Sequence, residues 1–427
     1  MLHNTFCRRL AALVLTLAVA VSAVLPVFAV YPMPIQTATE TEAVYLFNAD
    51  TGKTLLTQNA DQPRYVASLT KTMTALLLLE SGKDLNGEVT VPTDLTQEFK
   101  DIQNANGTTM GLRIGETVRR IDLLNALLIT SANDAASVIA WDVGGSLNAF
   151  IQQMNARAAE LGCTSATFTC AHGLYDYGNV ASAEDMAKIA AACAANETFA
   201  QVAGSTTYTL GQTNFHSEQR TISSSNPLMD ASGAYYKDSV KWVKGGFTTL
   251  AGRCIVAFAE KDGHTYGLVI LGCDTPDHLF AECDDLFDWA FASFADRPLV
   301  DIQTEITTVA LTKCRTEPTV ALYAAAPVSG YGHADDIVTY SFDLPESVSA
   351  TVKSGSVVGT ATVYLDGDEV GTVDLVTHKE YVSDFRTDMK ATVLLLCALL
   401  FILVALTAVT LAAGGGSLNL KKRRRRR

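Results

Sequence analysis

A serine and a lysine three residues apart, Ser68 and Lys71, open a run with helical character that extends to Glu80. At this spacing both side chains lie on one face of a helix, with Cβ atoms about 5–6 Å apart. A serine hydroxyl is a weak nucleophile, and a lysine that has lost its proton can activate it. That loss requires a lysine pKa lowered from about 10.4 towards about 7, which burial and a second cation can supply. Alone, the pair is also compatible with a helix cap and a solvated lysine.

Two further short motifs could complete such a site. Ser131 and Asn133 lie in a break between two helical stretches, where a hydroxyl can relay a proton and an amide can hold a substrate amide. The same residues could instead cap the helix that follows. Lys244 precedes Gly245 and Gly246 at the head of an extended run, so a positive charge stands beside backbone that a substrate can approach closely. By itself, Lys244 is more typical of an exposed turn.

The residues around these motifs are expected to form helices packed on hairpins. Helices are expected at 68–80, 120–129, 134–142, 147–161, 183–195 and 277–294, and hairpin strands at 43–48 with 54–58 and at 251–260 with 265–273. The first helix is apolar all round from Leu76 to Leu79, so it should be buried. From Leu299 to about Val382 the chain turns to short extended pieces rich in Val, Thr and Gly, which predicts a separate small β domain.

The N-terminus predicts export. A basic start, an apolar run from Leu10 to Val27 and a small residue at Ala29 are typical of a secretory signal peptide. We expect residues 1–29 to be removed by cleavage after Ala29. Cleavage after Ala23 and an uncleaved anchor helix are the alternatives.

The C-terminus predicts a membrane anchor. Residues 391–413 carry no charge, and at 1.5 Å per residue a helix of this length spans about 34 Å, enough for the hydrocarbon core. The tail at 414–427 ends in seven consecutive basic residues, which is the positive-inside arrangement. We therefore expect a single-pass protein of the cell membrane, with its body outside the cell and its C-terminus in the cytosol.

Composition excludes other classes of function. The 427 residues carry a net charge of −13, and the body between Glu40 and Asp388 is more acidic still because much of the basic charge lies at the chain ends. Such a body repels phosphate groups, so nucleic-acid binding is excluded. Among nine cysteines and seven histidines no metal-ligand spacing occurs, so no metal or other cofactor is expected. A disulfide between Cys254 and Cys273, on adjacent hairpin strands, is conceivable.

In their order and spacing the three motifs resemble the S-x-x-K, S-x-N and K-T-G motifs of the penicillin-recognising serine enzymes. More narrowly, the chain resembles the serine D-alanyl-D-alanine carboxypeptidases, the low-molecular-mass penicillin-binding proteins. The resemblance extends from roughly Tyr45 to Pro298 and includes the segments that begin at Arg64, Met110, Leu127, His172 and Phe247.

This resemblance implies a β-lactamase/transpeptidase-like α/β fold. An antiparallel sheet flanked by helices, together with an all-helical region, would form a catalytic domain at 38–297. A small all-β domain at 299–382 and one transmembrane helix would follow. The active site would lie between the sheet and the helical region.

The resemblance also implies a role for each candidate residue. Ser68 would attack the peptide carbonyl of a peptidoglycan stem peptide that ends in D-Ala-D-Ala, with Lys71 as general base. Ser131 would pass the proton to the departing D-alanine. Substrate would be bound by a set of residues from the second and third motifs, namely Asn133, Lys244, Gly246, Phe247 and Thr248. The backbone N–H groups of Ser68 and Phe247 would form the oxyanion hole, and a β-lactam antibiotic would stall as an ester on Ser68.

Two positions depart from the family pattern. Gly245 stands where threonine is usual, so a hydroxyl that would bind the substrate carboxylate is missing, at a cost of about 1–2 kcal/mol. Thr248 is near enough in sequence to compensate. Ala132 stands where glycine is commoner. The competing functions are a β-lactamase, a D,D-endopeptidase and a non-catalytic wall-binding protein, and the first lacks a Glu-x-x-Leu-Asn segment between the second and third motifs.

Overall fold

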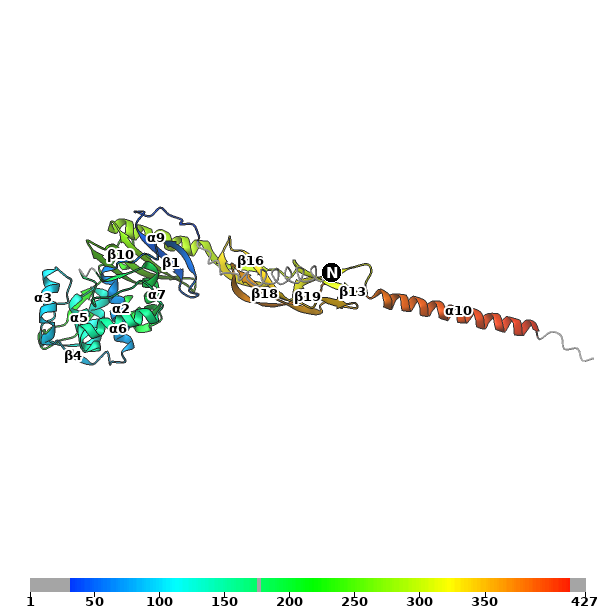
Figure 1. The fold of residues 1–427 in the computed structure, drawn as a ribbon, viewed down its shortest axis with the longest axis horizontal. Coiled ribbons are helices and arrows are strands. Elements are labelled where there is room, and N and C mark those ends of the chain that lie inside the picture. Colours follow the sequence, from blue (N-terminus) through cyan, green and yellow to red (C-terminus); the bar gives the residue numbers. More distant parts are fainter. Residues whose placement is uncertain (1–30, 175–177, 415–427) are drawn as a thin grey trace, which may run out of the picture. The chain divides into compact units, whose positions relative to one another are not determined.

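The computed structural model describes residues 31–174 and 178–414. The predicted signal peptide (1–29) and nearly all of the predicted basic tail (414–427) lie outside the described residues. The described chain divides into two compact units, one ending at Phe294 and one starting at Ala295 (Figure 1).

An antiparallel sheet with the strand order β2-β1-β11-β10-β9 forms the centre of the first unit. Its strands are β1 (Ala43–Asn48), β2 (Thr54–Gln58), β9 (Val240–Thr248), β10 (Gly252–Lys261) and β11 (His264–Cys273). Asp262 and Gly263 join β10 to β11 with positive φ angles of 53° and 84°, as a tight hairpin turn requires. Strands β10 and β11 are buried on both faces, because α9 (Pro276–Ser293) covers one face and α7 (Ala183–Ala194) packs against the other (Figure 1).

The helical region begins with η1 (Ala67–Leu69), which leads directly into α2 (Thr70–Glu80). Helix α2 is buried along nearly its whole length, as the all-round apolar stretch from Leu76 to Leu79 predicts. The other helices are α3 (Thr96–Asn104), α4 (Arg120–Ile129), α5 (Asn133–Gly144), α6 (Leu147–Glu160), α7 (Ala183–Ala194) and α8 (Glu197–Ala203), with short turns η2 (Thr93–Leu95) and η3 (Pro227–Met229). Small two-stranded pairs join them: β3 (Arg64–Tyr65) with β6 (Val180–Ala181), β4 (Glu88–Thr90) with β5 (Thr117–Arg119), and β7 (Thr207–Leu210) with β8 (Arg220–Ser223).

The second unit is built from strands. Its larger sheet has the order β16-β18-β19-β14-β13-β17, and β12 pairs with β15 in a second sheet. The strands are β12 (Phe294–Val300), β13 (Glu305–Thr312), β14 (Thr319–Ala324), β15 (Val328–His333), β16 (Val338–Asp343), β17 (Ser347–Ser349), β18 (Val357–Leu365) and β19 (Asp368–Val376). Alternate side chains such as Val320, Leu322, Ala361 and Val363 form its own core.

A long apolar helix, α10 (Asp384–Gly414), ends the described chain. Within the described residues, Met389–Leu411 is the one helical stretch long and apolar enough to cross a membrane. The predicted α/β fold, the all-β domain and the C-terminal apolar helix are therefore confirmed.

The disulfide considered between Cys254 and Cys273 is wrong, because both cysteines are free. The register of β10 and β11 shifts after Arg253, so Cys254 lies opposite Leu271 while Cys273 lies opposite Arg253. The sequence placed the two cysteines on adjacent strands but could not reveal this bulge.

Trp242 on β9 holds the helical region against the sheet. Its ring stacks on Phe258 of β10 at 4.5 Å between centroids and meets Phe199 of α8 edge-on at 5.1 Å. Because Trp242 is only 2% exposed, its loss would leave a cavity between the sheet and α8.

We predict that Trp242→Ala lowers the free energy of unfolding by about 3–5 kcal/mol, measured by urea unfolding followed by circular dichroism. Phe215→Ala is the control, because that ring is 42% exposed. We expect it to change stability by no more than about 0.5 kcal/mol, and equal effects of the two substitutions would contradict the role of Trp242.

Candidate active site

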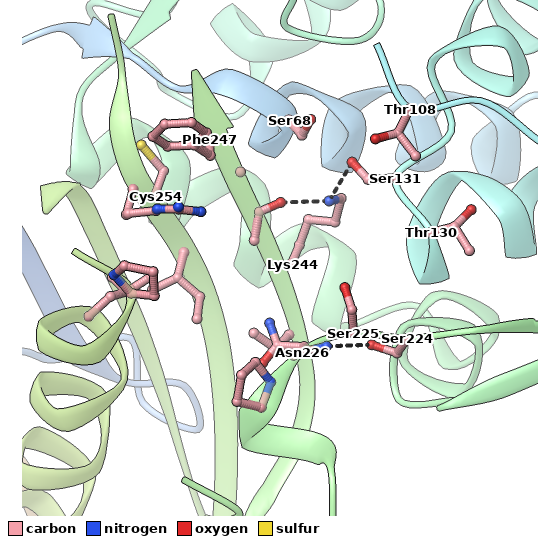
Figure 2. A pocket seen from close by; sticks show the side chains of 18 of the residues that line it. Ser68, Thr108, Thr130, Ser131, Ser224, Ser225, Asn226, Lys244, Phe247 and Cys254 are labelled. Carbon is pink, nitrogen blue, oxygen red and sulfur yellow. Dashed lines mark hydrogen bonds between the residues drawn. The ribbon is translucent and has the colours of Figure 1, made fainter. Parts of the chain in front are cut away.

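Three segments far apart in sequence meet at one cavity of about 650 Å³. Ser68 reaches it from η1, Ser131 from the break between α4 and α5, and Lys244 from β9. Figure 2 shows Ser68, Ser131 and the Lys244 amine turned towards the same space. The sequence motifs therefore come together at the junction of sheet and helical region.

A constrained turn presents Ser68. The preceding Ala67 has a φ of 47°, in the left-handed region that costs a residue with a side chain about 1–3 kcal/mol. Gly173, with a φ of 79°, packs against this turn so tightly that a Cβ there would lie 1.8 Å from the Ala67 carbonyl oxygen. From the other side, a Cβ at Gly246 would lie 2.8 Å from the backbone nitrogen of Ser68. Two glycines thus allow backbone to enclose the serine closely.

Lys71 is fully buried and lies one helical turn from the serine. Its Nζ is 2.9 Å from Ser68 Oγ, 2.8 Å from Asn133 Oδ1 and 2.7 Å from the His172 carbonyl oxygen. The last two atoms can only accept hydrogen bonds. A neutral amine has two N–H groups for those acceptors and one lone pair, which is left for the Ser68 hydroxyl.

The surroundings of Lys71 favour this neutral form. Burial lowers its pKa well below the ordinary lysine value, and the nearby positive charge of Lys244 lowers it further. The predicted helix-face pair of serine and lysine is therefore in the geometry and environment that activation of a hydroxyl requires.

The acceptors around Lys71 are themselves held in place. Asn133 donates from Nδ2 to the Thr108 carbonyl at 2.9 Å, which turns its oxygen towards Lys71. The His172 ring contacts Glu98 at 2.9 Å, and Glu98 also accepts a hydrogen bond from Ser137 at 2.9 Å. Burial alone would lower the pKa of His172, but hydrogen bonds to Cys170 and Glu98 outweigh it and raise the pKa to about 9. The His172 ring, held between Glu98 and the Leu174 amide, which donates to its Nδ1 at 3.1 Å, thus fixes the carbonyl that faces Lys71.

Ser131 and Lys244 form the second half of the site. Lys244 Nζ donates to Ser131 Oγ at 3.0 Å and to the Gly245 carbonyl at 2.7 Å (Figure 2). Ser131 has a φ of 61°, and α5 begins after Ala132 without a side-chain cap, so neither Ser131 nor Asn133 serves as a helix cap. Lys244 is 3% exposed, which contradicts an exposed turn lysine, and burial lowers its pKa to about 7.

Of the residues that follow Lys244 on β9, some line the cavity and Thr248 does not. Gly246 and Phe247 line it, and the Phe247 ring is 53% exposed with the Arg253 guanidinium 4.0 Å above its centre. The Thr248 hydroxyl instead accepts a hydrogen bond from the Ala251 amide at 3.0 Å, in the turn between β9 and β10. Thr248 is not among the residues that line the cavity.

The position of Gly245 leaves open space where a threonine side chain would stand. A Cβ there would meet nothing closer than Asn226 Nδ2 at 3.7 Å and the Cys254 carbonyl at 3.9 Å. Asn226 and Arg253 both line the cavity and both carry hydrogen-bond donors. Sequence reasoning missed these two residues, and it missed the pair of Glu98 and His172, although His172 lies in one of the segments that carry the family resemblance.

Comparisons with known proteins agree with this arrangement. The sequence pattern of the D-alanyl-D-alanine carboxypeptidase family matches residues 32–275, and that of the penicillin-binding protein 5 C-terminal domain matches residues 309–383. The D-alanyl-D-alanine carboxypeptidase DacF of Bacillus subtilis is 27% identical over 78% of this chain and 83% of its own length. A D-alanyl-D-alanine carboxypeptidase of Mycobacterium tuberculosis is 31% identical over 57% of this chain and 79% of its own length.

A solved structure has a fold similar to that of this chain. Penicillin-binding protein 5 from Haemophilus influenzae superposes with a TM-score of 0.58 at 24% identity, over 83% of this chain and 100% of that chain. The similarity therefore includes both the unit that contains the cavity and the β-rich unit.

Proposed function

The chain belongs to the D-alanyl-D-alanine carboxypeptidase family of serine hydrolases, and from this premise we propose that it removes the terminal D-alanine from peptidoglycan stem peptides through an ester on Ser68. One observation carries the proposal. Lys71 contacts two obligate acceptors and the Ser68 hydroxyl at 2.7–2.9 Å while buried from water. Such an amine is a base directed at one hydroxyl group.

In the proposed acylation step, Lys71 takes the proton of Ser68 as Oγ attacks the carbonyl carbon of the penultimate D-alanine. The backbone N–H groups of Ser68 and Phe247 stabilise the resulting oxyanion, a contribution of about 2.7–4 kcal/mol for each donor. Ser131, held by Lys244, relays this proton from Lys71 to the nitrogen of the departing D-alanine as the C–N bond breaks. Water then hydrolyses the ester, and a β-lactam that forms the same ester with Ser68 blocks the site.

Recognition of the substrate's terminal carboxylate requires donors beside Lys244. We assign Lys244 as the cation that attracts this group, with Asn133 and the backbone at Gly246 and Phe247 holding the peptide. The missing threonine hydroxyl at Gly245 leaves Asn226 and Arg253 as the side-chain donors next to that position. We infer that these two residues supplement Lys244 in carboxylate binding.

The proposed location follows from the substrate and from the apolar helix. Met389–Leu411 is long and apolar enough to cross a membrane. We propose that it anchors the protein with the catalytic unit outside the cell, where the wall peptides are, and with the basic tail in the cytosol. Removal of a signal peptide at 1–29 belongs to the same proposal.

Ser68→Ala should abolish covalent labelling by a fluorescent penicillin and release of D-alanine from a synthetic stem pentapeptide, because it removes the hydroxyl that Lys71 activates. Labelling is measured on a denaturing gel and D-alanine by a coupled enzymatic assay. Ser81→Ala, just beyond the other end of α2, is the matched control and should keep both activities. Labelling of the Ser68→Ala protein would overturn the assignment of the nucleophile. Release of hydrolysed penicillin by the wild type at many turnovers per second would favour a β-lactamase instead.

Gly245→Thr should raise kcat/KM for the pentapeptide about 5- to 15-fold, because one new hydrogen bond to the carboxylate contributes about 1–1.5 kcal/mol. The threonine side chain fits, since its Cβ would meet no atom closer than 3.7 Å. Gly245→Val has the same branched shape without the hydroxyl and should give no gain. An equal gain in both variants would show that shape rather than hydrogen bonding matters at this position.

The pH profile of kcat/KM should be bell-shaped. Activity rises with pH as Lys71 loses its proton at a pKa well below the ordinary value. Carboxylate binding then weakens as Lys244, whose pKa burial lowers to about 7, becomes neutral at higher pH. With a substrate whose terminal carboxylate is amidated, kcat/KM should still rise with pH but should no longer fall at alkaline pH. If kcat/KM for the amidated substrate still falls at alkaline pH, the charge of Lys244 does not contribute to binding of the carboxylate.

A further inference from the structure

A second cluster of ligand-type side chains lies where three segments of the first unit meet. Glu42 directly precedes β1, Cys273 ends β11, and Glu282 lies on α9. One carboxylate oxygen from each glutamate and the Cys273 sulfur all lie within 4.8 Å of one another. None of the three residues lines the active-site cavity.

The two glutamates are buried with three carboxylate oxygens that lack a hydrogen-bond partner, whereas the Cys273 thiol donates to the Thr275 carbonyl at 3.6 Å and to Asp274 Oδ1 at 3.9 Å. Glu42 and Cys273 are fully buried, and Glu282 is 6% exposed. Neither oxygen of Glu42 forms a well-aligned hydrogen bond, nor does Oε2 of Glu282, whereas Oε1 of Glu282 accepts one from the Ala38 amide at 2.6 Å. Among the described residues, no lysine, arginine or histidine forms an ion pair with any of the three. Two adjacent carboxylates in such a place require either a proton or a cation.

We propose that Glu42, Cys273 and Glu282 form a binding site for a divalent metal ion of the zinc class. Cysteine thiolates and glutamate carboxylates are both ligands that Zn²⁺ accepts, and the three residues would supply three of the four positions of a tetrahedral site, with a water molecule as the fourth. Calcium and magnesium prefer oxygen ligands alone, so the sulfur of Cys273 selects against them. Binding exchanges protons held by the cluster for the metal ion, and no other reactant is needed.

The bound metal would be structural rather than catalytic. It would link the segment before β1 to the end of β11 and to α9, two consecutive elements that most of the catalytic unit's sequence separates from β1. The hydrogen bond from Ala38 to Glu282 already directs the N-terminal segment to the same place. A metal held only by the folded chain raises its unfolding temperature in proportion to the logarithm of metal concentration.

The alternative occupant is a proton shared between the two carboxyl groups. Burial and the adjacent Glu282 raise the pKa of Glu42 to about 8, so a protonated Glu42 could donate to Glu282. This arrangement needs no thiol, and it predicts no change on addition of metal. Cys273 therefore distinguishes the two occupants.

The test uses the full chain in detergent, free of affinity tags and stripped of metal with a chelator. We expect one equivalent of Zn²⁺ to remain bound after gel filtration and the unfolding temperature to rise with added Zn²⁺. Co²⁺ should give the intense near-ultraviolet absorption of a thiolate ligand. Cys273→Ser should lose this absorption and most of the shift in unfolding temperature. Cys163→Ser removes a half-buried cysteine outside the cluster and should retain both.

Glu42→Gln keeps the shape of the side chain and provides a second variant, for which metal affinity should fall at least tenfold. Circular dichroism of the metal-free proteins checks that each variant is folded. The proposal is overturned if the wild-type protein binds no stoichiometric Zn²⁺ or if Co²⁺ gives no thiolate absorption. It is equally overturned if the folded Cys273→Ser protein binds both ions as the wild type does. None of these readouts depends on peptidase activity.

Discussion

The removal of the Lys71 amine from water is the constraint on which the catalytic unit depends. An amine in this position must satisfy two fixed acceptors and still keep a lone pair for Ser68, so its neighbours have little freedom. Helix α2 is buried along nearly its whole length, so the lysine in its first turn is kept from water. The pairing of Glu98 with His172 places one acceptor, and the Thr108 carbonyl orients the other. Much of the helical region thus serves to position one nitrogen atom.

The sequence was sufficient for most of the long elements, although it did not predict α3, α8 or the small strand pairs, and it named Ser68, Ser131 and Lys244, which the fold brings to one cavity. The break between α4 and α5 and the β10–β11 hairpin follow from local patterns, which depend only on neighbouring residues. The approach of Glu98 to His172, or of Asn226 to Gly245, depends on how loops pack and has no local signal. Thr248 illustrates the same limit, because its closeness to Gly245 in sequence does not reveal that its hydroxyl closes a turn.

The cluster of Glu42, Cys273 and Glu282 extends this point to sites that motif searches cannot detect. Ligand spacings such as C-x-x-C identify metal sites built from one loop, whereas these three residues come from a strand start, a strand end and a helix. The same antiparallel sheet that brings β9 to the nucleophile also brings β1 beside β11. One topology therefore creates two places where distant polar side chains meet, at different parts of the same sheet.

Gly173, which packs against the turn of the nucleophile, and Gly245, which lines the cavity, differ in mutational freedom. At Gly173 even a single methyl group would collide with the Ala67 carbonyl, so this position is closed to every other amino acid. At Gly245 there is room, and the strand backbone there is ordinary. A substitution at the cavity rim can therefore change what the site binds while leaving the turn that presents Ser68 intact, whereas a substitution at Gly173 disturbs that turn itself.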